Sequence, residues 1–162
     1  MTRFGVGPWV ILLFLAGAAI LFAVRAHFPD TFRFGIGSQV LRPAGFALLA
    51  AGLALWLTAI VAVQRAISQR RLVTTGAFAF CRHPVYASWA VVITPAIGLL
   101  LDTWLAFVLA VVFGVAVRAA VASEERNMET LFGDEYRAYC RRTPAVLPFG
   151  WLSQFRRSRL DV

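Results

Sequence analysis

Apolar stretches long enough for membrane helices alternate along this chain with short segments that carry arginine. Four stretches hold no charged residue, at positions 8–24, 43–63, 84–101 and 104–117. A transmembrane helix needs about 20 apolar residues, and we expect the fourth to continue past Arg118 towards Ser123. Only Asp102 and Thr103 separate the third stretch from the fourth, which predicts an antiparallel hairpin. The pattern predicts an all-α polytopic membrane protein with about four transmembrane helices.

The composition favours a membrane protein over a soluble domain. Of the 162 residues, 60% are hydrophobic, and the mean hydropathy is +0.73. The formal charge of +8 raises the possibility of nucleic-acid binding, but the arginines lie between and after the apolar stretches, where membrane topology explains them better. We therefore expect the lipid bilayer as a partner and no nucleic acid. A signal peptide is the alternative for 8–24, but its apolar run exceeds the usual length of about 7–15 residues.

The arginine distribution predicts the orientation of the helices. With four spans, the N-terminus, the 64–82 connection and the C-terminal tail share one side and hold 13 of the 16 arginines. By the positive-inside rule this side is cytoplasmic, so we expect both termini there, in an inner or plasma membrane. The tail should form a short cytoplasmic helical segment, with residues 151–162 lying on the anionic leaflet. Cys81 and Cys140 fall on the same side, which predicts reduced thiols.

Polar residues gather first in the stretch RRLVTTGAFAFCRHPVYASW, residues 70–89. Pro84 is suited to the first turn of a helix, and it pushes His83 out of the α region. The free N–H groups of that turn should then face a ligand in front of them. Gly76 should permit a tight approach of the preceding loop.

The second polar cluster follows the fourth apolar stretch and centres on Glu124 and Glu125. Adjacent carboxylates beside a membrane are costly unless cationic or hydroxyl groups pair with them. Facing Arg82 and His83, they would form a pocket with a cationic and an anionic wall. Such a pocket fits a ligand that has a carboxylate together with a cationic, hydroxylated portion, which is the pattern of S-adenosylmethionine.

Both clusters resemble the signature of isoprenylcysteine carboxyl methyltransferases and their relatives, which include the phospholipid N-methyltransferases. The resemblance is carried by LVTTG at 72–76, Phe78 and RHPxY at 82–86, followed by the glutamate pair, LFGxxY at 131–136, Tyr139 and RxPxxxP at 142–148. It implies an integral membrane enzyme that uses S-adenosylmethionine and releases S-adenosylhomocysteine. Because the chain shows no repeat and no low-complexity linker, we expect one domain over 1–162, with two N-terminal transmembrane helices in 1–63. The resemblance, which covers about residues 64–149, implies a cofactor-binding catalytic half in 64–162.

The resemblance also assigns candidate site residues. The cofactor contacts it implies are Gln64, Leu72, Val73, Phe78, His83, Pro84, Val85, Tyr86, Glu124 and Glu125. The catalytic candidates are Arg82, Arg118 and Glu125. Phe78 stands where the family often has tyrosine. Ala120 stands where the eukaryotic enzymes have a substrate-side arginine, and Arg118, seven residues before Glu125, is the nearest arginine on that helical face.

Simpler interpretations of the same residues remain open. Arg82 can be a topological anchor, His83 a helix cap, and the glutamate pair a solvated helix end, although glutamates at a C-terminal end oppose the helix dipole. No metal is expected, because Cys81-x-His83 is not a zinc spacing.

The function expected is carboxyl O-methylation of a lipid-like or isoprenylcysteine-type acceptor, without an obligate protein partner. Methylation of a phospholipid amine or a small thiol is the enzymatic alternative. A small membrane assembly or transport subunit is the alternative that is not an enzyme.

Overall fold

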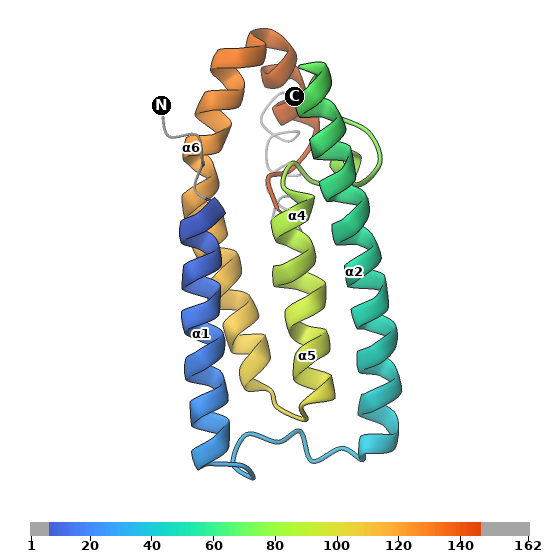
Figure 1. The fold of residues 1–162 in the computed structure, drawn as a ribbon, viewed down its shortest axis with the longest axis vertical. Coiled ribbons are helices and arrows are strands. Elements are labelled where there is room, and N and C mark those ends of the chain that lie inside the picture. The colour runs from blue at the N-terminus through green and yellow to red at the C-terminus, as the bar shows by residue number, and fades with distance from the viewer. Residues whose placement is uncertain (1–6, 147–162) are drawn as a thin grey trace, which may run out of the picture.

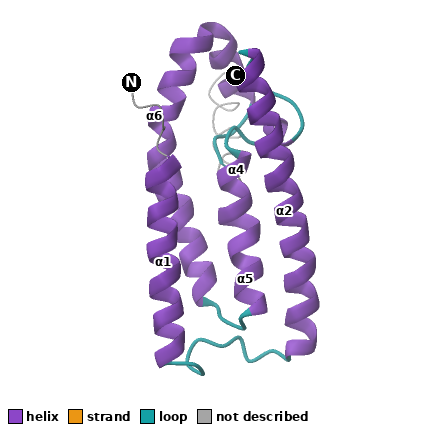
Figure 2. Ribbon diagram, in the orientation of Figure 1, coloured by secondary structure: helices purple, strands orange, loops and turns teal. Residues whose placement is uncertain are grey.

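The fold is that of an antiparallel set of long helices, described here for residues 7–146 from a computed structural model (Figure 1). The regular elements of this part of the chain are all helical (Figure 2). They are α1 (Gly7–His27), α2 (Ser38–Gln69), α3 (Ala77–Phe80), α4 (Pro84–Ala87), the π-helix η1 (Ser88–Ile93), α5 (Thr94–Leu100) and α6 (Leu105–Arg142).

The predicted all-α membrane architecture is confirmed. α1, α2 and α6 are each long and apolar enough to cross a bilayer, and α4, η1 and α5 together form a shorter apolar helix over Pro84–Leu100. α2 begins before Pro43 and ends well after the apolar stretch at 43–63. The predicted boundaries were too narrow because hydropathy marks the part of a helix in lipid, whereas backbone hydrogen bonding continues into polar residues.

The length of α2 and α6 carries them beyond the bilayer. At 32 and 38 residues they measure about 48 and 57 Å, against about 30 Å for the hydrocarbon core. Both project at the end of the molecule where α1 begins and α4 starts (Figure 1). There a buried cluster joins Val10 of α1 to Cys81, Val121 of α6 and Ala145. Among the described residues, the start of α1, the connection between α2 and α4 and the end of α6 therefore lie at one end of the molecule, as the arginine distribution predicts.

The opposite end is closed by the connection between α1 and α2. Arg33 Nε donates to Asp102 Oδ2 at 2.8 Å, and the Phe34 N–H donates to Asp102 Oδ1 at 3.2 Å. The Trp104 N–H donates to the Phe32 carbonyl at 3.1 Å. Asp102 itself sits in the tight turn between α5 and α6 with a left-handed φ of 52°. The predicted hairpin is confirmed.

Close packing of α2 on the broken helix depends on small residues. A Cβ on Gly52 would lie 2.8 Å from Cγ1 of Ile93, which is 1% exposed. Small residues allow helix backbones to approach in this way in membrane proteins. The π-helical turn at Ser88–Ile93 is followed directly by α5, whose second residue, Pro95, cannot donate a backbone hydrogen bond. α2 therefore fixes the position of the helix whose first residues carry RHPxY.

α6 does not end near Ser123, which corrects one argument made from sequence. It continues to Gly133, whose φ of 51° and ψ of −124° break the helix direction, and then to Arg142. Glu124 and Glu125 therefore lie inside a helix, and the argument that they oppose a C-terminal dipole is wrong. The segment after Gly133 is helical and turns back toward the start of α4 (Figure 1). Pro148 and the tail at 151–162 lie outside the described residues.

Candidate functional site

A pocket of about 720 Å³ opens between the projecting ends of α2 and α6 and the segment that joins α2 to α4. Apolar side chains supply most of its wall, and charged or polar groups are interspersed among them. The lining residues are Val63, Ala66, Ile67, Arg70, Arg71, Leu72, Val73, Phe78, Arg82, His83, Glu124, Asn127, Met128, Leu131, Phe132, Tyr136 and Tyr139.

The segment that leads into the pocket is shaped by its backbone. Gly76 has a φ of 63°, so a side chain there would be strained, yet nothing lies within 4 Å of the position of its Cβ. The glycine is thus required for backbone conformation, and the predicted tight approach is wrong. His83 has a φ of −122° and a ψ of 60°, and Pro84 opens the helix as expected. Pro84 is fully buried.

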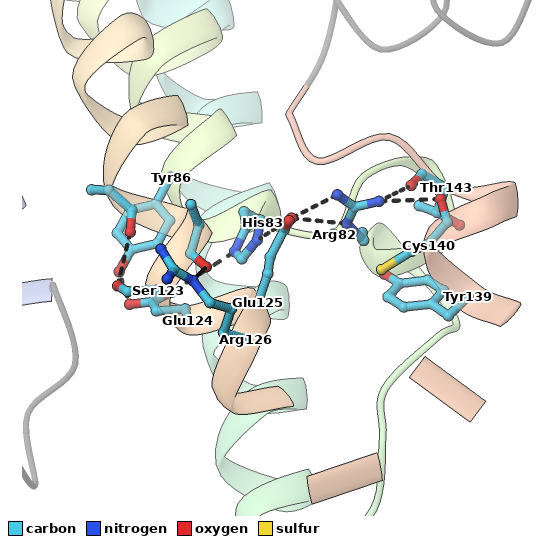
Figure 3. A network of polar contacts seen from close by, with 12 residues as sticks. Arg82, His83, Tyr86, Ser123, Glu124, Glu125, Arg126, Tyr139, Cys140 and Thr143 are labelled. Atoms are coloured by element: carbon cyan, nitrogen blue, oxygen red, sulfur yellow. Dashed lines mark hydrogen bonds and ion pairs between the residues drawn. The ribbon is translucent and has the colours of Figure 1, made fainter. Parts of the chain in front are cut away.

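Arg82 holds the two polar clusters together (Figure 3). Its Nε and Nη2 donate to Glu125 Oε1 at 3.0 and 2.6 Å, and its Nη1 donates to the carbonyls of Cys140 and Thr143 at 3.2 and 2.9 Å. Its backbone N–H donates to the Pro144 carbonyl at 2.8 Å. One guanidinium therefore ties the start of α4 to the middle and the end of α6.

The charge of Arg82 is maintained in spite of partial burial. Burial opposes the charged form, but the hydrogen bonds and the charge of Glu125 outweigh it, so the pKa of Arg82 is raised. The side chains of Arg82 and Glu125 are only 11% and 21% exposed. Despite burial, the pKa of Glu125 is lowered by its hydrogen bonds with His83 and Arg82, so both partners of this ion pair are charged at neutral pH.

The two glutamates have different surroundings. Glu125 is paired with Arg82 and lies 3.3 Å from His83 Nε2. Glu124 lines the pocket, accepts a hydrogen bond from the Tyr86 hydroxyl at 3.0 Å, and has its Oε2 3.9 Å from His83 Nδ1. Figure 3 shows His83 between the carboxylates, with Tyr86 on the far side of Glu124. Glu124 is thus the carboxylate that lines the pocket, while Glu125 is paired with Arg82 behind it.

The predicted site residues differ in whether they line the pocket. The pocket wall includes Leu72, Val73, Phe78, Arg82, His83 and Glu124. Tyr86 and Glu125 adjoin it through the hydrogen bonds above. The described lining does not include Gln64, Pro84, Val85 or Arg118, and Gln64 and Arg118 are exposed on α2 and α6.

Some lining residues were not identified from the sequence. Asn127, Met128 and Leu131 follow Glu124 at helical spacing, so a longer predicted fourth helix would have placed them on one face. Tyr139 donates its hydroxyl to the Phe78 carbonyl at 2.6 Å and so fixes the pocket wall. That contact joins residues 61 positions apart, and no local pattern indicates it. Among the described residues, no group of three or more His, Cys, Asp and Glu side chains could hold a metal ion.

Comparison with known proteins shows which family the sequence matches. The sequence profile described as "Phospholipid methyltransferase" matches residues 41–135, more than half of the chain. A nickel-cobalt-cadmium resistance protein of Alcaligenes xylosoxydans xylosoxydans is 29% identical over 157 residues, which cover 96% of this chain and 69% of that protein. The protein-S-isoprenylcysteine O-methyltransferase of Mus musculus is 35% identical over 88 residues, covering 48% of this chain and 28% of the mouse enzyme.

A solved structure has the same fold. It is that of a eukaryotic intramembrane Ras methyltransferase, an isoprenylcysteine carboxyl methyltransferase, and it matches with a TM-score of 0.64 at 19% identity. The match covers 91% of this chain and 55% of the solved one. The resemblance inferred from the two sequence motifs is thereby confirmed.

Proposed function

The chain belongs to the phospholipid methyltransferase family of integral membrane methyltransferases, and on this premise we propose that it transfers a methyl group from S-adenosylmethionine to a lipid-like acceptor. The observation that carries the proposal is the pocket, which presents the Glu124 carboxylate beside His83 within largely apolar walls. We also propose that this pocket faces the cytoplasm, from the arginine asymmetry.

The residues of the pocket suit such a donor. Glu124 can accept hydrogen bonds from a ribose diol and offset a nearby positive charge, while Tyr86 holds its carboxylate in place. His83 is placed to contact the carboxylate of the amino-acid portion. Phe78 and Phe132 supply aromatic surface for a flat base. Leu72 and Val73 add further apolar side chains to the pocket wall.

Transfer of a methyl group to a carboxylate requires the protein mainly to position the two substrates. S-adenosylmethionine supplies a methyl group on a sulfonium sulfur. A carboxylate acceptor is already ionised at neutral pH, so one of its oxygens would bond to the methyl carbon while the carbon–sulfur bond broke, and the electron pair of that bond would stay on sulfur. No proton has to move. The role left to the protein is to align the reactants and exclude water. Arg82 and Glu125 are bonded to each other, so neither is needed as an acid or base in this step.

Carboxyl O-methylation of a lipid-like or isoprenylcysteine-type acid is our first choice. Methylation of a phospholipid amine is the second, favoured by the description of the matching family. An amine must lose a proton, and Glu124 is the pocket carboxylate available to take it. In both cases the acceptor reaches the pocket from the bilayer.

Labelled methyl transfer tests the proposal. Membranes that contain the protein are incubated with S-adenosylmethionine labelled in its methyl group, and membranes with the Glu124→Gln variant serve as the control. We expect label in the lipid fraction that mild alkali releases as methanol, because methyl esters hydrolyse. Alkali-stable label would indicate the amine alternative. Label no higher than in the variant would contradict methyl transfer at this pocket.

A further inference from the structure

The described wall of the pocket carries one side-chain amide, that of Asn127. Asn127 is exposed, and it is the only asparagine in the chain. Within residues 7–146, no hydrogen bond engages its side chain. The neighbouring carboxylate of Glu124, by contrast, already accepts a hydrogen bond from Tyr86. The Asn127 amide therefore has both its N–H groups and its carbonyl oxygen available to a ligand in the pocket.

Asn127 lies almost one helical turn beyond Glu124, on the face of α6 that lines the pocket. Met128 and Leu131 belong to the same face. The apolar part of α6 ends before Glu124, so the residues that follow lie progressively further from the bilayer. At about 1.5 Å per residue, Asn127 lies roughly 4.5 Å further along the helix axis than Glu124. A ligand held at Glu124 that extends away from the bilayer must therefore pass Asn127.

The contacts proposed for the donor determine the direction in which its base extends. His83 is assigned to the amino-acid carboxylate and Glu124 to the ribose diol. The acceptor comes from the bilayer, so the methyl group has to face that side. The base is joined to the opposite side of the ribose and therefore extends along α6, away from the bilayer. It then lies beside Asn127, among the aromatic side chains of Phe78 and Phe132 that also line the pocket.

The chemistry of an amide matches adenine better than it matches other flat bases. The Asn127 side chain offers an acceptor and a donor next to each other. Adenine offers the complementary pair, an exocyclic amino group beside a ring nitrogen, and the bidentate pairing of asparagine with adenine is well known from protein–DNA interfaces. Aromatic walls alone would accept any flat base, because every base has a π face. The amide is therefore the group in this pocket that can distinguish bases.

We propose that Asn127 recognises the base of the methyl donor. Its carbonyl oxygen accepts a hydrogen bond from the 6-amino group of adenine, and its N–H donates to the adjacent ring nitrogen. This inference rests on the proposed methyl transfer from S-adenosylmethionine and names the residue that makes the same pocket selective for adenine.

A pair of ligands that differ only in the 6-amino group tests the assignment. The purified chain in detergent is titrated calorimetrically with S-adenosylhomocysteine and with its analogue in which hydrogen replaces that amino group. We expect the wild type to bind S-adenosylhomocysteine about tenfold more tightly than the analogue, and Asn127→Leu to bind both equally. Leucine has a similar size and a higher helix propensity than asparagine, so this variant should fold.

Two further variants separate recognition from shape. Gln69→Leu is the matched control, because it removes an amide from an exposed position at the end of α2, outside the pocket lining, and should keep the preference. Asn127→Asp keeps the size of the side chain but places an acceptor opposite the ring nitrogen. It should therefore bind S-adenosylhomocysteine more weakly than the wild type does.

The possible outcomes separate this inference from the proposed function. Equal affinity of the wild type for the two ligands overturns the role of Asn127, and so does a preference that survives in Asn127→Leu. Loss of the preference in Gln69→Leu, or wild-type affinity for S-adenosylhomocysteine in Asn127→Asp, overturns it as well. Failure of the wild type to bind either ligand would instead refute the proposed function, and this inference with it.

Discussion

Replacing Arg82 with glutamine should destabilise the whole motif-bearing end of the molecule. The change leaves Glu125, whose side chain is 21% exposed, without its main partner and removes the donor from two backbone carbonyls. Loss of one member of a buried ion pair costs about 3–5 kcal/mol, whereas exposed pairs contribute about 0–1 kcal/mol. Because this pair is only partly buried, we expect about 3 kcal/mol.

The assay is thermal unfolding of the purified protein in detergent. At roughly 2–4 °C for each kcal/mol in a chain of this size, Arg82→Gln should lower the midpoint by roughly 6–12 °C. Arg137→Gln is the matched control, since its pairs with Glu129 and Asp134 are formed by a side chain that is 56% exposed. A shift in Arg82→Gln no larger than in Arg137→Gln would refute the assignment of Arg82 as the tie between α4 and α6.

Three further outcomes are expected, for the Asp102 turn, for His83 and for the orientation in the membrane. The pKa of Asp102 is lowered, chiefly by the hydrogen bond from Arg33, so this carboxylate stabilises the fold at neutral pH and loses its effect as the pH falls through the lowered pKa. Asp102→Asn should therefore melt below the wild type at pH 7, with a difference that shrinks below about pH 4; a pH-independent difference would contradict the linkage. His83→Ala should insert normally but bind S-adenosylhomocysteine more weakly by calorimetry, and equal affinity would remove His83 from the donor site. Reporter fusions after Arg71 and after Asp102 should report opposite sides of the membrane, and a common side would overturn the proposed orientation.

The sequence predicted the helices, the hairpin and the meeting of two polar clusters. It did so because hydrophobic stretches report which residues can lie in lipid, and a two-residue link leaves neighbouring helices little choice of direction. Pro84 could be placed at the first turn of its helix for a local reason, the absence of an N–H group.

The sequence did not indicate which contacts each residue of the site makes. Adjacent glutamates look equivalent in a string of letters, but successive residues of a helix point in different directions, so Glu125 meets Arg82 and Glu124 meets the pocket. The contact of Tyr139 with the Phe78 carbonyl depends on how distant segments pack, which no local propensity encodes.

Calorimetric titration of S-adenosylhomocysteine into the purified chain tests the donor site most directly. The wild type should bind saturably at one site, and Glu124→Gln should weaken binding about tenfold to a hundredfold, as expected for loss of a charge-assisted hydrogen bond. Glu129→Gln, a change of the same kind on an exposed part of α6 outside the pocket lining, should retain wild-type affinity. Absence of binding to the wild type, or equal affinity in wild type and Glu124→Gln, would contradict the assignment of this pocket to the methyl donor.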